Sequence, residues 1–163
     1  MARSVGQAIP DSIRPLFDGA DLEAHEGLTL LLLTTTDAGW PHLAMLSVGE
    51  IVAVGARELR LALWLNSTAT TNLARTGQAT LALVHAEAGY SLRCTARRGA
   101  DLHLERSGRL AFFALRVEDV LEDIAPYAVL DSGVRFHLKE PDQVLPHWRA
   151  TVAALREAAP PAR

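Results

Sequence analysis

The chain has 163 residues, of which 49% are hydrophobic and 21% are charged, a composition that fits one soluble domain with a substantial core. Its net charge of −3, its pI of about 6.0 and its scattered arginines argue against nucleic-acid binding. No apolar run approaches the ~20 residues that cross a bilayer, and the N-terminus lacks the apolar core of a signal peptide, so we expect a cytoplasmic protein without a membrane partner.

The sequence predicts a single domain over residues 1–163, which begins with a helical segment at residues 1–26. Pro10 and Pro15 punctuate short helical pieces in this segment. Residues 19–26 form the best helix candidate among these pieces.

A hairpin follows this segment. Residues 28–36 are apolar and β-branched, as expected for a buried strand. Residues 37–39 have turn chemistry, so residues 40–48 are predicted to return as the antiparallel partner strand. Residues 49–54 are predicted to form a third short strand or a bulged continuation of the second.

The next strand leads directly into a predicted helix. Leucine occupies every second position of residues 59–65, which is the pattern of a strand with one buried face. Residues 67–75 begin with good helix-cap side chains and continue with helix formers, and Gly77 is a natural helix stop. Residues 79–84 are predicted to form another strand.

The second half of the chain contains further strands and one helix. Alternating patterns predict strands at residues 90–98 and 110–121, and residues 129–138 are the candidate for a last short strand. Residues 141–158 carry apolar side chains at spacings of three and four, which predicts an amphipathic C-terminal helix. Six or seven strands at hairpin spacing predict a mainly β fold, either a small antiparallel barrel or a sandwich.

The helix start after residue 66 is a candidate anion site. A helix N-terminus presents free backbone N–H groups and a partial positive charge, both of which favour a phosphate. However, Ser, Thr and Asn also cap many helices that bind no ligand. This stretch alone therefore leaves the phosphate site and a simple cap as alternatives.

Other common sites are not indicated by the sequence. Neither a nucleophile elbow, a P-loop nor a dinucleotide fingerprint is present. Cys94 is the only cysteine, and we expect it to be buried packing. No metal site is predicted, because no two histidines have the spacing of paired ligands on a helix or strand; they stand at positions 25, 42, 85, 103, 137 and 147.

In order and spacing, four blocks of the chain resemble the FMN-binding split β-barrels related to pyridoxamine-phosphate oxidase. That family has a G-x-P hairpin, an apolar strand and an S-x-K-x-x-N-L helix start, and here Ser67, Asn72 and Leu73 match the helix-start pattern. The matching blocks are residues 39–47, 61–65, 67–73 and 77–84, which together make up 29 of the 163 residues.

The resemblance implies an antiparallel six- or seven-stranded split barrel with peripheral helices. It also implies a homodimer that holds FMN at the subunit interface, with the phosphate near the helix start and the ring along the strands. The residues predicted to contact the cofactor on this basis are His42, Leu43, Ala44, Met45, Ser47, Trp64, Asn66, Ser67, Thr68 and Thr71.

The chain also departs from the family pattern. His42, Ser47 and Ala69 stand where the family often has an arginine and two lysines that bind phosphate. Each charged hydrogen bond to phosphate contributes roughly 1.5 to 3 kcal/mol, so tight FMN binding requires other donors or cations to compensate for the missing arginine and lysines. The threonines of the helix start, the helix N–H groups, Arg75 and Arg93 are the candidates for it.

Three functions therefore remain as predictions. The first is an FMN-dependent oxidoreductase that acts on a small molecule, although not vitamin B6 oxidation, because the C-terminal arginine-bearing strand of the oxidase proper is replaced here by a helix. The second is a split barrel without flavin that serves as a binding or sensing module. The third is a haem-binding or haem-degrading relative.

Overall fold

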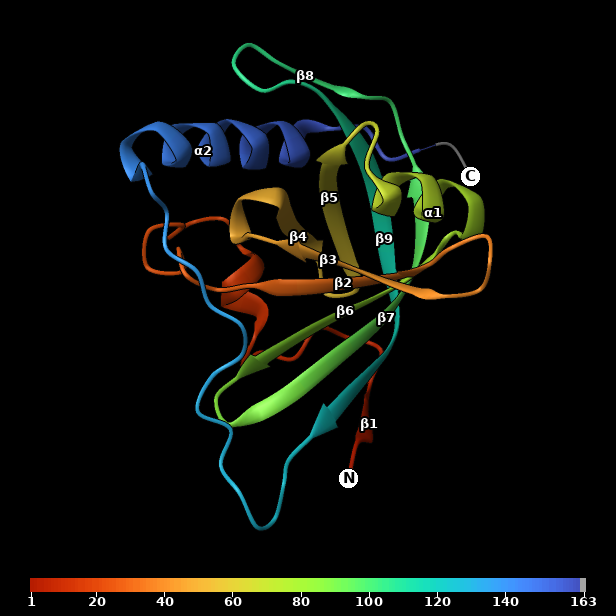
Figure 1. Cartoon of the computed structure of the whole chain (residues 1–163), viewed down its shortest axis with the longest axis vertical. Helices are drawn as coiled ribbons and strands as arrows, with labels where there is room; N and C mark the ends of the chain where they lie inside the picture. Colours follow the sequence, from red (N-terminus) through yellow and green to blue (C-terminus); the bar gives the residue numbers. More distant parts are fainter. Residues whose placement is uncertain (162–163) are drawn as a thin grey trace.

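Nine antiparallel strands form one sheet that curls into an incomplete barrel, with two helices on its outside (Figure 1). The structure is a computed structural model, and it describes residues 1–161. The strands are β1 (Arg3–Gly6), β2 (Leu30–Thr35), β3 (Pro41–Leu46), β4 (Ile51–Gly55), β5 (Glu58–Trp64), β6 (Gln78–His85), β7 (Ala88–Arg98), β8 (Leu102–Leu104) and β9 (Gly108–Asp123).

The sheet does not close on itself. Its strand order is β3-β2-β6-β7-β9-β5-β4, so β3 and β4 are the two end strands. The long strand β9 also pairs with β1 and β8. The mainly β, antiparallel split barrel with peripheral helices that the sequence predicted is confirmed, but the sheet has nine strands where six or seven were expected.

The helix α1 (Thr68–Thr76) lies beside the open part of the barrel, against β2, β3, β5 and β7. Ser67 is its N-cap, and its C-cap Gly77 adopts the left-handed conformation at φ 63°. Both ends of this helix were predicted correctly. The buried side chains of Ala69 and Leu73 join it to the barrel core.

The helix α2 (Pro141–Glu157) packs on the outer side of β4, β5 and β8, and it matches the predicted C-terminal helix. A second hydrophobic core forms beneath it, separate from the barrel interior. Arg60 of β5 donates from Nη1 to the carbonyls of Leu155 and Arg156, each at 2.7 Å, and so caps the C-terminus of α2. Among residues 1–161, no helix is long and apolar enough to span a membrane.

Two predicted elements are wrong. Residues 19–26 form turns, in which Asp18 and Asp21 accept backbone N–H groups, and the only helical turn in the first 26 residues is the 3-10 helix η1 (Arg14–Phe17). Only Leu22 of this stretch is buried in the core, which is too little to hold a short helix. Residues 129–138 form no strand beyond a single bridge between Leu28 and Arg135.

Candidate cofactor site

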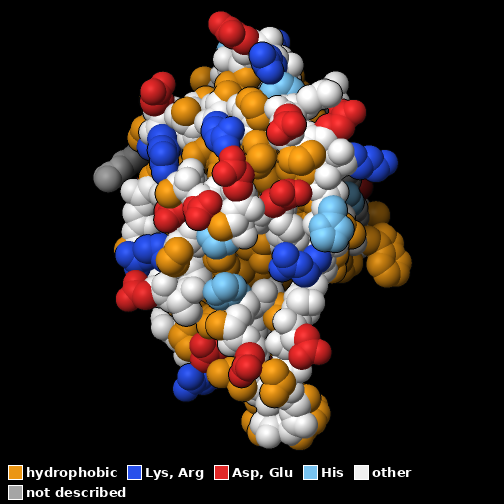
Figure 2. Space-filling view, turned by 90° about the vertical axis from the view of Figure 1, so that its left-hand side faces the viewer, with side chains coloured by type: hydrophobic (Ala, Val, Ile, Leu, Met, Phe, Trp, Pro, Cys, Tyr) orange, Lys and Arg blue, Asp and Glu red, His pale blue; other side chains and the backbone are white. Residues whose placement is uncertain are grey.

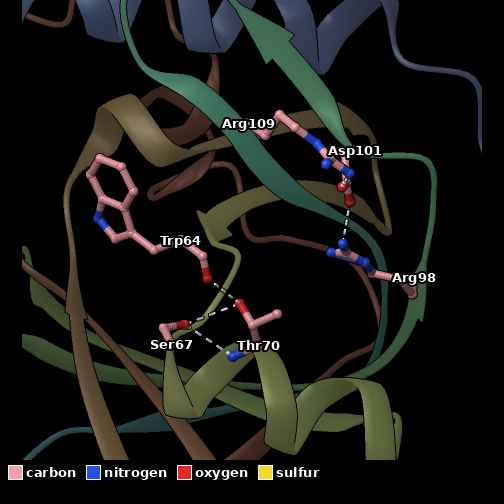
Figure 3. A network of polar contacts seen from close by, with 6 residues as sticks. All are labelled: Trp64, Ser67, Thr70, Arg98, Asp101 and Arg109. Carbon is pink, nitrogen blue, oxygen red and sulfur yellow. Dashed lines mark hydrogen bonds and ion pairs between the residues drawn. The ribbon is translucent and has the colours of Figure 1, made fainter.

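The first turn of α1 lies directly after β5 and contains most of the predicted phosphate ligands. The Ser67 Oγ accepts the Thr70 N–H at 3.1 Å and donates to Thr70 Oγ1 at 3.0 Å. Thr70 Oγ1 in turn donates to the Trp64 carbonyl at 2.8 Å (Figure 3). These two hydroxyls are therefore used inside the protein, as in a helix cap without a ligand.

Other donors of this turn are open to solvent. Thr68 is exposed, and no hydrogen bond within residues 1–161 involves its hydroxyl. The N–H groups of Thr68 and Ala69 belong to the first turn, where a helix offers them no partner of its own. Thr71 is also exposed, and its Oγ1 donates to the Ser67 carbonyl over a long 3.4 Å. The turn thus leaves the Thr68 hydroxyl and two backbone N–H groups open for an anion, and the Thr71 hydroxyl would join them only by giving up its long bond.

Ala69 occupies the position of the family's phosphate-binding lysine, but here this position is not at the surface. Its side chain is 1% exposed and packs into the barrel core together with Leu73. A long cationic side chain at this position would have to leave the core to reach an anion. Position 69 of this chain therefore faces the barrel core and not the open side of the first turn.

His42 on β3 is connected to α1 through a polar chain. Asn72 Nδ2 donates to Thr34 Oγ1 at 3.0 Å, within the buried part of the contact between α1 and β2. Thr34 Oγ1 lies 3.4 Å from His42 Nδ1, and its own proton is free to point there. Either atom of this contact donates according to the histidine tautomer, and Nε2 of His42 lies on the side of the ring away from Thr34.

The remaining predicted residues of β3 lie on opposite faces. Leu43 and Met45 are exposed on the outer face, and Ala44 is half-buried on the inner one. Ser47, just after the strand, is buried and donates from N and from Oγ to Glu50 Oε2, at 2.7 and 2.8 Å. This capping box opens the 3-10 helix η2 (Val48–Glu50).

His42 and Ser47 are far apart for ligands of one phosphate. The pairing of β2 with β3 is regular, without a bulge. Five residues of regular strand span roughly 16 Å, so the two side chains can only contact different parts of an extended molecule.

Trp64 and Asn66 lie at the end of β5. Both are exposed, and the Trp64 indole ring points away from the first turn of α1 (Figure 3). Trp64 stands on the face of β5 opposite the leucines, together with Arg60. However, α2 covers Arg60 and Ala62 on this face, whereas Trp64 stays exposed at the end of the strand.

A cluster of charges that the sequence analysis did not identify lies at the same end of the barrel (Figure 3). Asp101 accepts hydrogen bonds from Arg98 and from Arg109, the latter at 2.5 Å. The Arg98 guanidinium also lies 5.2 Å over the Phe113 ring, and its buried Nη1 has no partner within residues 1–161. The sequence could have indicated the direction of Arg98, because alternate residues of a strand face the same side and Arg98 follows the inward Cys94 and Ala96 at intervals of two.

The two arginines that were considered as compensation lie elsewhere. Arg75 is in the last turn of α1 and donates to the Thr35 carbonyl, about 10 Å along the helix from Thr68. Arg93 is on the outer face of the sheet, 3.7 Å from Asp119. Neither side chain lies at the start of α1.

A hollow of about 380 Å³ on the outer sheet face is lined by Thr35, Thr80, Arg93 and Thr95, and it borders on Cys94, whose side chain belongs to the barrel core. Burial, with a smaller contribution from the Glu118 carboxylate, raises the pKa of the Cys94 thiol to about 12. The thiol is therefore protonated at neutral pH, which agrees with its predicted structural role and not with a nucleophilic one.

Comparisons with known proteins give the following findings. No protein-family model matches the chain. The chain is 37% identical over 149 residues to the uncharacterised protein YclD of Bacillus subtilis (strain 168), a match that covers 90% of this chain and 94% of that protein.

Solved structures with the same arrangement of strands have low sequence identity to this chain. A proposed pyridoxamine 5′-phosphate oxidase from Lactobacillus delbrueckii has a TM-score of 0.57 at 14% identity, over 72% of this chain and 98% of that chain. HupZ from group A Streptococcus has a TM-score of 0.55 at 15% identity, over 78% and 98%. A heme binding protein from Mycobacterium smegmatis has a TM-score of 0.50 at 18% identity, over 89% and 61%. At these identities the likeness concerns the fold.

Proposed function

The chain belongs to the same family as YclD of Bacillus subtilis and has the split-barrel fold related to pyridoxamine 5′-phosphate oxidase, and from this premise we propose that it binds FMN and is a flavin-dependent oxidoreductase. The observation that carries the proposal is the first turn of α1, where the Thr68 hydroxyl and two backbone N–H groups are open at the end of β5. Bound FMN would supply hydride or electron transfer to a small-molecule substrate.

The residues of this chain fit the parts of FMN. The phosphate requires donors, for which the hydroxyls of Thr68 and Thr71 and the Nε2 side of the His42 ring are the candidates. Positive charge comes from the Arg98, Asp101 and Arg109 cluster, which carries two cations for one carboxylate at the same end of the barrel. One edge of β3 has no strand partner within residues 1–161, so its backbone N–H and C=O groups can meet the polar rim of the flavin ring.

The spectrum of the purified protein tests this proposal. A flavin spectrum, or saturable quenching of added FMN fluorescence, is the expected result. Persistent absence of colour and of FMN binding would refute the proposal and favour the flavin-free binding module. That alternative is supported by the Ser67 and Thr70 hydroxyls, which form hydrogen bonds within the protein. A Soret band would favour the haem-binding alternative.

Replacing Thr68 and Thr71 together by valine is expected to weaken FMN binding about tenfold, because two hydrogen bonds to the phosphate are lost. Both side chains are exposed, so the melting temperature should change little. FMN titration followed by fluorescence measures the effect. Thr76→Val, at the other end of α1, is the matched control and should leave the affinity unchanged. Equal affinity of the double variant and the control would place the phosphate elsewhere.

The proposal includes a homodimer with the cofactor at its interface. The outer side of β3 and the turn before it expose three large apolar side chains: Trp40 at 72%, Leu43 at 49% and Met45 at 64%. Leu43 and Met45 are directly opposite Leu33 and Leu31 of β2, so the apolar surface continues across two strands. A continuous apolar face of this kind is typical of a protein interface.

Leu43→Glu is expected to convert the dimer to a monomer and to reduce FMN binding, because it introduces a charge into the buried interface. Light scattering after size-exclusion chromatography gives the mass. Val54→Glu, which changes an exposed residue of the end strand β4, is the control and should remain dimeric. A monomeric parent protein, or a dimeric Leu43→Glu variant, would exclude this interface.

A further inference from the structure

A cleft separate from the start of α1 lies beneath the N-terminal half of α2. It is bounded by η2, by α2 and by the segment of residues 133–138, which we call the strap. Two cavities of about 400 Å³ and 230 Å³ share Glu50, Val144 and Trp148 as lining residues. On the side of the molecule shown in Figure 2, apolar side chains gather between acidic and basic ones. The larger volume lies within the range of small-molecule pockets.

The walls of this cleft are aromatic and are held in place. The Phe136 N–H of the strap donates to the Gly27 carbonyl at 3.3 Å, and the Leu138 N–H donates to Glu26 Oε1 at 3.0 Å. The Phe136 and Trp148 rings form an edge-to-face pair, with centroids 6.3 Å apart and planes at 81°. The aromatic surface is therefore formed before any ligand arrives.

The floor of the cleft is a carboxylate that is only half satisfied. Glu50 Oε2 accepts both hydrogen bonds from Ser47, whereas Oε1 makes no hydrogen bond within residues 1–161. Burial raises the pKa of Glu50, and the hydrogen bonds from Ser47 only partly oppose this rise. Within residues 1–161, Oε1 of Glu50 therefore has neither a hydrogen-bond donor nor a cation as partner, and a positively charged ligand would supply both.

No cation of residues 1–161 is paired with Glu50. Arg135 and His147 line the two cavities, but among the described residues neither forms an ion pair with Glu50. The Arg135 guanidinium lies over Gly27 instead. A second polar group is also unsatisfied, because Thr29 lines the larger cavity, is 5% exposed, and its Oγ1 has no hydrogen-bond partner.

We propose that this cleft binds a small organic amine with an aromatic or alicyclic body. The ammonium group donates to Glu50 Oε1 and lies beside the Trp148 ring, where a cation is also favoured by the ring face. The apolar body packs against Phe136 and Leu138, and Thr29 Oγ1 accepts a further N–H. This site does not depend on FMN, so its test can fail or succeed independently of the flavin proposal.

Titration of flavin-free protein with phenethylamine tests the site. The indole N–H signals of the three tryptophans are followed by nuclear magnetic resonance and are assigned with Trp40→Phe and Trp64→Phe variants. We expect a saturable shift of the Trp148 signal and none of the Trp40 signal. Phenylacetate, which has a similar body and the opposite charge, should not shift Trp148. Absence of a saturable Trp148 shift up to about 20 mM phenethylamine would overturn the proposal.

Glu50→Gln isolates the charge, because its amide oxygen can still accept from Ser47 and preserve the cap. We expect at least tenfold weaker phenethylamine binding, whereas Glu140→Gln, an exposed change at the start of α2, should bind normally. If Glu50→Gln does not keep the nuclear magnetic resonance spectrum of the folded protein, the Thr29→Val variant is measured in its place. About threefold weaker phenethylamine binding by Thr29→Val would then support the site. Unchanged affinity in the deciding variant overturns it.

Discussion

Replacing Gly49 by alanine is expected to lower the free energy of unfolding by roughly 2–3 kcal/mol, because the new methyl group would overlap the Trp148 ring. Gly49 is buried in η2, and Trp148 packs directly on its backbone from α2. No flexible side chain can yield there, so the ring or the whole helix must shift. The shift would also open the second core, which Trp148 shares with Leu145 and Val152.

Urea denaturation measures this loss, and the melting temperature should fall by about 5–10 °C in a chain of this size. Gly55→Ala is the matched control, since its nearest contacts are ordinary ones at 3.6 Å or more, to Glu58. The control should change stability by less than about 0.5 kcal/mol. Equal stability of the two variants would mean that α2 does not press on η2 as described.

The second large effect concerns the position at which the family pattern has a lysine. Ala69→Lys is expected to destabilise the fold by roughly 2–4 kcal/mol without strengthening FMN binding, because the Ala69 side chain is 1% exposed and faces the barrel core. A lysine there must bury its charge or push α1 away from the sheet. The added charge would therefore act on stability before it could act on a phosphate.

Unfolding in urea and FMN titration, performed on the same variant, separate these effects. Ala74→Lys changes an exposed residue of the same helix, adds the same charge and should be tolerated. If Ala69→Lys were as stable as the control and bound FMN more tightly, position 69 would have to face the cofactor. In that case, the orientation of α1 described above would be wrong.

Local signals in the sequence were sufficient for the main elements. Turn residues and alternating leucines predicted the hairpin of β2 and β3 and the strand β5, and the Ser67 and Gly77 caps predicted α1. All of these depend on neighbours within a few positions. The fold class and the resemblance to the split-barrel family followed from their order.

Elements that depend on distant partners were missed. All four residues of β1 are exposed, and it is held to β9 by contacts such as Arg3 with Glu122. Its sequence has no buried face that periodicity could detect. Strand parity could place Arg98 on the inner face, but its cluster with Asp101 and Arg109 forms only in the folded sheet. The capping box of Ser47 and Glu50 was visible in the sequence as an S-x-x-E pattern, but it was overlooked.

The strand β9 has a consequence for the order in which the protein forms. It pairs with β7, β5, β1 and β8, so four separate parts of the chain depend on residues 108–123 for a partner. During synthesis, β1 leaves the ribosome first, yet its partners at positions 120–122 emerge more than a hundred residues later. The pairings that join the two parts of the sheet through β9 are therefore made late, and until then the nascent chain carries unpaired strand edges that invite association with other chains.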